Sequence, residues 1–567
     1  MRLLIVVFIL VTFTFSLNLA QAPIGIHDSH TVYLKDLTDS FNANKMRERV
    51  KRLSADDFEG RGPGTTGGRL ASQYIADQLK ASGVKPGNKG SYFQNVPLFG
   101  VKADPRTVLR VEKTDGSNGK IYKFGDDFVA TTGAQTARVS VNAELVFVGY
   151  GIDASLYHWK DYKGPAEDYR GKVLVMLVND PPATAAEPDL FGGKSLTYYG
   201  RWTYKYEEAA RRGAAGVILV HTTESAGYGW NVVRTSNGNW RYEIARTAAD
   251  TTPFLQFKSW VTNETADRMM KQAGLDLDDL KNKAKNRDFQ PVKTGLTVKL
   301  DLQSETKTFD SPNVIGMVEG SDKNLKNEYV VFSAHWDHLG IGEPDAKGDR
   351  IYNGAYDNAS GCAAILGIAD VLSKMPKKDR PRRSVLVLFP TAEEQGLLGS
   401  EYYTDHPLVP LAKTAANVNV DGVNIFGKVS DFMPLGAERS SIMDQINEAA
   451  MERKMTVKPD MNPDKGFFFR SDHFPFAKAG IPSVSLQHGS TFLKPLDTVA
   501  AGFFNDYTEK YYHQVSDEYH DWWDMSAMVQ EAELTLAIGV KIANASGLPR
   551  YKDTDEFSAA DKQRFKK

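Results

Sequence analysis

The chain has 567 residues, more than one hydrophobic core usually supports, so we expect two or more folding units. Its hydrophobic content of 41% and charged content of 25% are ordinary for a soluble globular protein. A formal net charge of -2 gives no reason to expect nucleic acid as a partner, so the function has to be inferred from local groups of residues.

The first 22 residues have the pattern of a cleavable secretory signal. Arg2 precedes an apolar run over residues 3–15, and the segment ends in the small-residue pattern Ala20-Gln-Ala22. A retained membrane anchor is the alternative, but the run is shorter than the ~20 residues of a spanning helix and polar residues interrupt it. We therefore expect export to the periplasm or the medium, with no stable membrane insertion after cleavage.

Residues 23–138 are expected to form the first part of the main folding unit. Helical periodicity covers residues 41–83 and ends at Gly83, whereas the Gly- and Pro-rich segment 58–64 inside it is expected to be a loop. Residues 91–148 alternate between apolar and polar in the manner of strands.

Residues 139–290 have a different pattern of apolar and polar residues. Apolar strands over 173–178 and 215–220 flank a helical stretch at 205–212, which predicts a strand–helix–strand unit. The region contains no cluster of metal-ligand residue types, so we expect a separate module without a site of its own.

Residues 291–550 alternate strands with helices, which predicts an α/β fold with a mixed, largely parallel sheet sandwiched by helices. The expected strands are 329–333, 384–389, 416–420 and 482–486, and a helix is expected over 361–373. Ligands of such sheets bind at the carboxyl ends of the strands, and residues of metal-ligand type follow several of these strands. The last segment, 551–567, is charged, and we expect it to be solvated.

The first motif is His335-Trp-Asp337, directly after a strand. Residues two apart in a strand point the same way, so Asp337 can hydrogen-bond the ring nitrogen of His335 that does not bind metal. By the same periodicity His338 faces away, and we leave it out of the site. A His-x-Asp pattern alone is weak evidence for a metal.

Two acidic motifs follow. Asp357 begins a helix, where it is either an N-cap or a carboxylate that bridges two cations. Glu393 and Glu394 follow a strongly apolar strand, which disfavours a merely solvated acidic turn. Neighbouring residues face opposite ways, so one glutamate can bind metal while the other acts as a general base toward water.

The set is completed by Asp421, which follows another strand, and by His513, which lies next to the phenol of Tyr512. Two histidines and three acids suit a two-zinc site with one bridging carboxylate, because mixed nitrogen and oxygen ligation favours zinc over magnesium or calcium. The two metals of such sites lie ~3.5–4 Å apart.

Five motifs occur in order over residues 335–517: His-x-Asp, Gly-x-x-Asp-Asn-x-Ser-Gly, Glu-Glu-x-Gly-x-x-Gly-Ser, Asn-x-Asp and Tyr-His-x-x-x-Asp. Together they resemble the twenty-eighth metallopeptidase family, which includes leucyl-type di-zinc aminopeptidases and, more distantly, glutamate carboxypeptidase and glutaminyl cyclase. The resemblance implies two Zn²⁺ ions per chain. It assigns His335 and Asp421 to one zinc, Glu394 and His513 to the other, and Asp357 to both.

The resemblance also implies roles beside the metals. It makes Glu393 the general base, Asp337 the residue that orients the histidine, and Tyr512 a hydrogen-bond donor to the tetrahedral oxyanion. Arg470, in the segment Arg-Ser-Asp-His, is a weaker candidate for contacting the substrate. Residues 139–290 look like a protease-associated domain inserted into the peptidase.

The sequence therefore predicts an exported aminopeptidase that hydrolyses N-terminal residues from peptides. Arg470 is the one basic residue that we place near the site, whereas a carboxypeptidase would need a basic cluster to bind a terminal carboxylate. A carboxypeptidase-type relative, a glutaminyl cyclase with one zinc, and a non-catalytic binding protein of the same fold remain alternatives.

Overall fold

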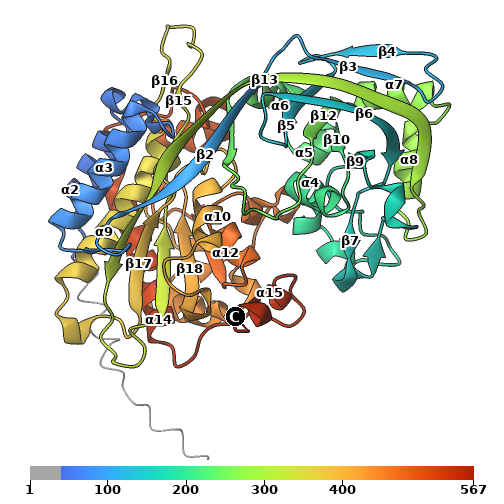
Figure 1. Ribbon diagram of the computed structural model, residues 1–567. Coiled ribbons are helices and arrows are strands. Elements are labelled where there is room, and N and C mark those ends of the chain that lie inside the picture. Colours follow the sequence, from blue (N-terminus) through green and yellow to red (C-terminus); the bar gives the residue numbers. More distant parts are fainter. Residues whose placement is uncertain (1–39, 567) are drawn as a thin grey trace, which may run out of the picture. The chain divides into compact units, whose positions relative to one another are not determined.

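The structure is a computed structural model that describes residues 40–566 (Figure 1). The predicted secretory signal lies outside the described residues. Within them no helix is both long enough and apolar enough to cross a membrane.

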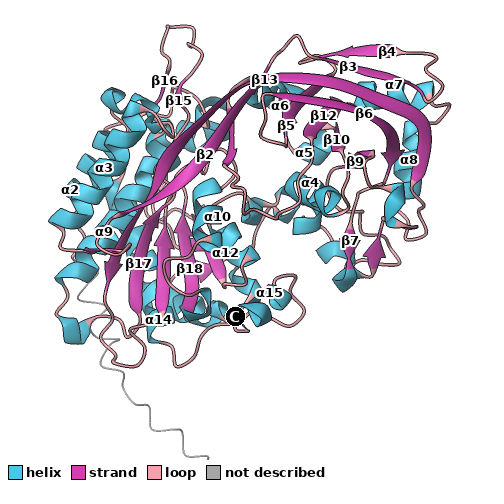
Figure 2. Cartoon of the chain, in the orientation of Figure 1, coloured by secondary structure: helices cyan, strands magenta, loops and turns pink. Residues whose placement is uncertain are grey.

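The main sheet is built around four parallel strands. These are β14 (Tyr329–Ser333), β17 (Ser384–Phe389), β18 (Thr414–Val420) and β21 (Ser483–His488). They lie in the order β17-β14-β18-β21. Every residue of β17 and β18 is buried, because helices cover both faces of the sheet (Figure 2). The predicted α/β fold with a largely parallel sheet is confirmed.

Helices from distant parts of the sequence cover this sheet. On one side lie α2 (Ala43–Leu53), α3 (Thr66–Ala81), α9 (Gly361–Lys374) and α14 (Met525–Asn544), and on the other lie α10 (Leu398–Asp405) and α12 (His473–Lys478) (Figure 1). The first two helices begin where their sequences supply a cap, since the side chains of Asn42 and Thr65 accept hydrogen bonds from first-turn amides.

One long strand, β13 (Val292–Val318), belongs to two sheets. Its second half pairs with β2 (Phe93–Ala103) and β17 in the main sheet. Its first half pairs with β3 (Val108–Lys113) and β6 (Arg138–Phe147) in a second sheet. The second sheet also contains β4 (Lys120–Lys123), β5 (Phe128–Thr132), β9 (Val173–Leu177), β10 (Gly216–His221) and β12 (Phe257–Thr262).

The second sheet extends beyond the expected module of residues 139–290. It takes in β3, β4 and β5 on one side and the first half of β13 on the other. Alternating polar and apolar residues look the same in either sheet, so the pattern over residues 91–148 could not show which sheet each strand joins. Residues 104–303 are called the insert below. One of its strands, β11 (Arg241–Ile244), returns to pair with β2.

We expected the C-terminal segment 551–567 to be solvated, but the structure packs it on the main domain. Its helix α15 (Ser558–Arg564) packs on the main domain, with Tyr551 and Phe557 buried. The guanidinium of Arg564 is also buried and donates to the carbonyl oxygen of Thr414 at 2.6 Å. The prediction rested on the charged residues of the segment, whereas the structure buries two of its aromatic side chains and pairs Arg564 with Asp561 at 3.0 Å.

Candidate metal centre

Two histidines and one aspartate form the middle of the site. His335 follows β14, and its Nε2 lies 3.3 Å from Asp357 Oδ1 and 3.2 Å from Asp421 Oδ1. His513 Nε2 lies 3.4 Å from Asp357 Oδ2 and 2.9 Å from Glu394 Oε2. The two oxygens of Asp357 therefore face two different groups of ligand atoms. The structure brings all five predicted metal ligands together.

These spacings suit tetrahedral coordination. Zinc ligands at 2.0–2.1 Å from the metal stand about 3.3 Å from one another in a tetrahedron. Three overlapping groups of such atoms occur at the site: His335 with Asp357 and Asp421, His335 with Glu393 and Glu394, and His338 with Asp357 and Glu394. The ring nitrogen Nε2 of His513 makes no hydrogen bond despite its short distances to carboxylates, as expected of a nitrogen placed to bind a metal.

The site also carries an excess of negative charge that bound cations would balance. Seven buried or half-buried carboxylates gather around the described site: Asp337, Asp357, Glu393, Glu394, Asp421, Asp472 and Asp517. Burial raises the pKa of Asp337 to about 8 and that of Asp472 to about 7. Burial opposes protonation of His335, but nearby carboxylates outweigh it and raise its pKa well above the usual value. The donor types and the excess of negative charge both fit divalent cations.

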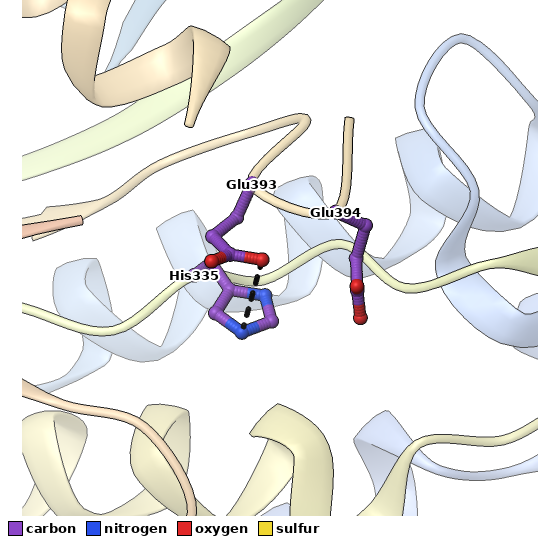
Figure 3. Close-up of side chains that lie close together, drawn as sticks. All are labelled: His335, Glu393 and Glu394. Atoms are coloured by element: carbon purple, nitrogen blue, oxygen red, sulfur yellow. Dashed lines mark ion pairs between the residues drawn. The ribbon is translucent and has the colours of Figure 1, made fainter. Parts of the chain in front are cut away.

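Glu393 lies beside the proposed metal ligands and is itself 8% exposed (Figure 3). Its Oε2 is 3.9 Å from His335 Nε2, whereas Glu394 turns toward His513. Burial raises the pKa of the Glu393 carboxyl well above its usual value. The two adjacent glutamates thus face different parts of the site, as the sequence predicted.

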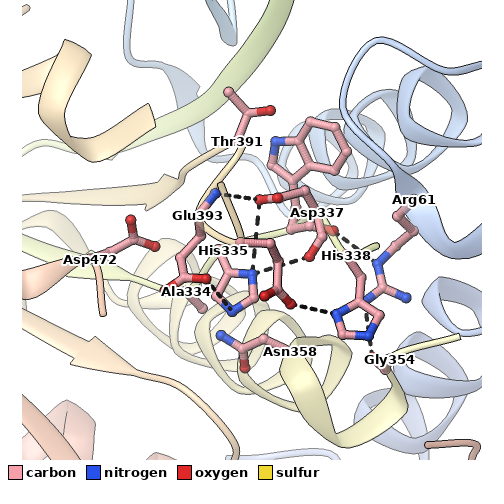
Figure 4. A network of polar contacts seen from close by, with 12 residues as sticks. Arg61, Ala334, His335, Asp337, His338, Gly354, Asn358, Thr391, Glu393 and Asp472 are labelled. Carbon is pink, nitrogen blue, oxygen red and sulfur yellow. Dashed lines mark hydrogen bonds and ion pairs between the residues drawn. The ribbon is translucent and has the colours of Figure 1, made fainter. Parts of the chain in front are cut away.

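Asp337 contacts His335 in a different way from the one expected. Its main-chain oxygen lies 3.1 Å from His335 Nδ1, and its carboxylate oxygen Oδ1 lies 3.9 Å from the same nitrogen. That oxygen instead accepts the amide proton of Glu393 at 3.1 Å (Figure 4). The reason is that β14 ends at Ser333, so the alternation of a strand does not continue to residue 337.

The same departure from strand geometry brings His338 into the site. The expectation that His338 faces away from the site was therefore wrong. His338 is 1% exposed, and its Nδ1 lies 2.6 Å from Glu394 Oε1. Its ring also lies edge-on to that of His513, with 5.7 Å between centroids. The sequence did offer one indication that His338 belongs to the site, because it is a histidine three residues after the predicted ligand His335.

Other buried groups hold the ligands in place. Both carboxylate oxygens of Asp517 accept main-chain amides, at 2.9 Å from Tyr356 N and 3.0 Å from Asp357 N. Ser471 donates to Asp421 Oδ2 at 2.7 Å. The two aspartates proposed as ligands are thus held by neighbouring groups, as metal sites usually require.

Arg61 is a further residue that the sequence did not reveal. It lies in the expected loop 58–64, where the chain forms an irregular 3₁₀ turn (Asp56–Arg61). Its buried guanidinium donates to the carbonyl oxygens of Trp336 and Gly354, both at 2.9 Å. Arg61 therefore ties the N-terminal segment to the main chain of the first two motifs.

The two remaining predicted residues lie at the edge of the site. The ring of Tyr512 stacks on that of His513, with centroids 3.9 Å apart, and is 45% exposed. Arg470 is exposed and donates to the carbonyl oxygen of Lys465 at 2.8 Å. It directly precedes Ser471, the hydrogen-bond donor to Asp421.

Residues 313–538 match the family model described as Peptidase family M28. The match covers about two fifths of the chain, which is similar to this family over that region. Among its relatives, Aminopeptidase YwaD of Bacillus subtilis is 30% identical over 185 residues, which are 32% of this chain and 36% of that protein. Aminopeptidase NAALADL1 of Mus musculus is 32% identical over 139 residues, which are 24% of this chain and 17% of that protein.

The M28 match covers the whole proposed ligand set, but the curated relatives align only in part. The chain spans about a sixth to a third of their lengths. Among solved structures, the aminopeptidase from Aneurinibacillus sp. strain AM-1 is 20% identical, with 92% of this chain and 97% of that chain covered and a TM-score of 0.49.

Proposed function

We propose that the protein is a two-zinc aminopeptidase that removes N-terminal residues from peptides. The observation that carries this proposal is the position of Asp357 between two histidines, with one carboxylate oxygen toward each. His335 and Asp421 would hold one zinc, and Glu394 and His513 the other.

When bound, the zinc pair would polarise a water molecule and the scissile carbonyl and stabilise the developing negative charge. Glu393 would accept the water proton on its carboxylate and return it to the leaving amine. Its raised pKa suits a group that both takes up and releases a proton. Asp337 would fix the main chain of Glu393 through the amide hydrogen bond, and Tyr512 would donate to the oxyanion.

The excess of carboxylates also suits an amino-terminal substrate. A free ammonium group would be attracted by the acids around the metals, whereas a terminal carboxylate would be repelled unless a cation received it. The relatives named as aminopeptidases support the same choice. We further propose that the chain is exported and that the insert is a protease-associated domain beside the substrate.

A panel of substrates tests this function. Aminoacyl p-nitroanilides and free peptides should be hydrolysed, N-blocked versions should not, and a chelator should abolish turnover that added zinc restores. Cleavage of N-blocked peptides from the C-terminus would favour a carboxypeptidase. One tightly bound zinc together with cyclisation of N-terminal glutamine would favour a cyclase, and no turnover with zinc supplied would favour a binding protein.

A further inference from the structure

Arg61 is a buried cation whose guanidinium binds main-chain oxygens. The side chain is 1% exposed, and four of its five N–H groups donate to carbonyl groups. The acceptors are Leu53 at 2.8 Å, Trp336 and Gly354 at 2.9 Å each, and Asn353. Among the described residues, no carboxylate forms an ion pair with this guanidinium. A buried charge is costly unless hydrogen bonds compensate it, so the guanidinium and the four carbonyl groups hold one another in place.

Two of these carbonyl groups lie beside proposed zinc ligands. Trp336 directly follows His335, and Gly354 lies three residues before Asp357. The Arg61 guanidinium lies next to Gly354 (Figure 4). His335 Nε2 and Asp357 Oδ1 are 3.3 Å apart. Each of these two ligands is therefore within three residues of a carbonyl group that the same side chain binds.

Gly354 contacts the site directly. Its φ is +55°, and a Cβ atom at this position would overlap the carbonyl oxygen of Asp357 and lie 2.6 Å from the ring of His338. The main-chain oxygen of Arg61 also accepts the amide proton of His338, at 3.3 Å. A shift of the Gly354 main chain would therefore move both the bridging aspartate and the histidine beside Glu394.

A short hairpin separates the two motifs that Arg61 holds. It consists of β15 (Gly340–Ile341) and β16 (Ile351–Tyr352), which pair over two residues each. Gly60 packs against both strands, since a Cβ atom there would lie 2.5 and 2.6 Å from their main-chain oxygens. A two-stranded hairpin is only marginally stable by itself. The turn that carries Arg61 therefore supplies much of what keeps the two motifs together.

Arg61 also lies in the electric field of the acids of the metal centre. Burial lowers the pKa of Arg61, and nearby anionic groups, among them Asp357, Asp517 and Asp337, act in the opposite direction. An arginine stays protonated inside a protein, so this charge is permanent. Because the guanidinium donates to carbonyl groups, it balances part of the negative charge without occupying the ligand atoms of a metal.

We propose that Arg61 is a positioning residue of the metal centre, whose hydrogen bonds to both motifs set the spacing of His335 and Asp357 and thereby the affinity for zinc. The consequence for catalysis rests on the proposed aminopeptidase function, whereas the consequence for metal binding does not. The hydrogen bonds of Arg61 end on the main chain. We therefore expect it to affect zinc affinity and kcat and to leave substrate binding unchanged.

Arg61→Met tests the proposal, because it removes every N–H donor and keeps an unbranched side chain. Zinc affinity should fall roughly 10–100-fold in a titration against a zinc-buffering chelator. With zinc at saturation, kcat for leucine p-nitroanilide should fall at least about tenfold, and KM should stay within about twofold of the wild type. The visible absorption bands of the cobalt-loaded protein should shift, because they depend on the geometry of the ligands.

Arg61→Lys separates charge from geometry. Lysine keeps the positive charge, but its donors sit on one nitrogen and cannot span both motifs as the planar guanidinium does. Zinc affinity and kcat should lie between those of the wild type and Arg61→Met. Wild-type values in Arg61→Lys would show that the charge alone suffices and would overturn the positioning role. This variant also decides the question if Arg61→Met does not fold.

Arg383→Met is the matched control. Arg383 is likewise 1% exposed, donates to the carbonyl oxygen of Ala545 at 2.6 Å and pairs with Glu328 at 3.0 Å. It directly precedes β17, at the opposite end of this strand from Glu393. Arg383→Met should lower the thermal midpoint, as Arg61→Met does, but leave zinc affinity, the cobalt spectrum and kcat unchanged.

The outcome that contradicts the proposal is a lower thermal midpoint in the Arg61 variants with unchanged zinc affinity, cobalt spectrum and kcat. Arg61 would then contribute to packing alone, as Arg383 does. Failure of the aminopeptidase function would look different, because the wild-type chain would not cleave leucine p-nitroanilide. The zinc titration and the cobalt spectra would still show whether Arg61 positions the metal centre.

Discussion

Buried carboxylates occur both in the insert and at the metal centre, but their partners differ. In the insert, Asp161 accepts hydrogen bonds from Ile152 N and Trp159 Nε1, both at 2.9 Å. At the metal centre, Asp357 and Asp421 face ring nitrogens of histidines and other carboxylates. A buried carboxylate that accepts hydrogen bonds from fixed N–H groups is satisfied by the protein alone and has a structural role. A buried carboxylate that faces histidine nitrogens and other carboxylates needs a cation to balance its charge.

The largest expected effect is at Glu393, the acid that we assign to chemistry alone. Glu393→Gln keeps the shape but cannot accept the water proton, so kcat should fall roughly 10²–10⁴-fold. Zinc content should stay at the wild-type level, because the five ligands are intact. Steady-state kinetics with metal analysis checks both, and a near-normal kcat would show that Glu393 is not the base.

The next effect tests whether His338 belongs to the centre. His338→Gln removes the ring that holds Glu394 at 2.6 Å, so zinc affinity should fall roughly 10–100-fold. His158→Gln, at an exposed histidine of the insert, is the matched control and should not change the affinity. Titration against a zinc-buffering chelator measures the difference. An unchanged affinity in His338→Gln would return His338 to a purely structural role.

The smallest effect is expected at Asp161. Each carboxylate oxygen of Asp161 accepts one N–H group, so Asp161→Asn leaves one of these donors facing an amide NH₂ group, which should cost about 1–3 kcal/mol of unfolding free energy. Zinc content and kcat should not change. Thermal scans at one rate, together with the activity assay, measure these quantities. A loss of zinc in Asp161→Asn would contradict the distinction between this hydrogen-bonded acid of the insert and the acids of the metal centre.

The pH dependence at Asp161 has a definite sign. Burial raises the pKa of Asp161 to about 6, above its value in the unfolded chain. The protonated form is therefore favoured on folding, so its contribution to stability is complete below about pH 4 and is lost as the pH rises through about 6. The asparagine variant should lack this decline.

Much of the centre could be predicted from the sequence because its ligands follow buried strands. The apolar runs 329–333 and 384–389 correspond to β14 and β17 residue for residue, and His335 and Glu393 follow them within a few residues. The contacts of Asp337 and His338 could not be predicted in the same way, because strand periodicity stops where the strand ends.

Contacts between residues far apart in the sequence set the other limits of what could be predicted. Nothing local shows that Val292–Val318 forms one strand shared by two sheets, so the extent of the insert was missed. Buried Arg61 was missed for the same reason, since its partners Trp336 and Gly354 lie 275 and 293 residues further along the chain.

The central claim is a two-metal centre bridged by Asp357, and the zinc content of the purified protein tests it most directly. We predict two zinc ions per wild-type chain, two in Asp161→Asn, and one or fewer in Asp357→Asn after dialysis against the same zinc buffer. A wild-type chain that binds a single zinc, or an Asp357→Asn variant that keeps two with unchanged affinity, would contradict the account.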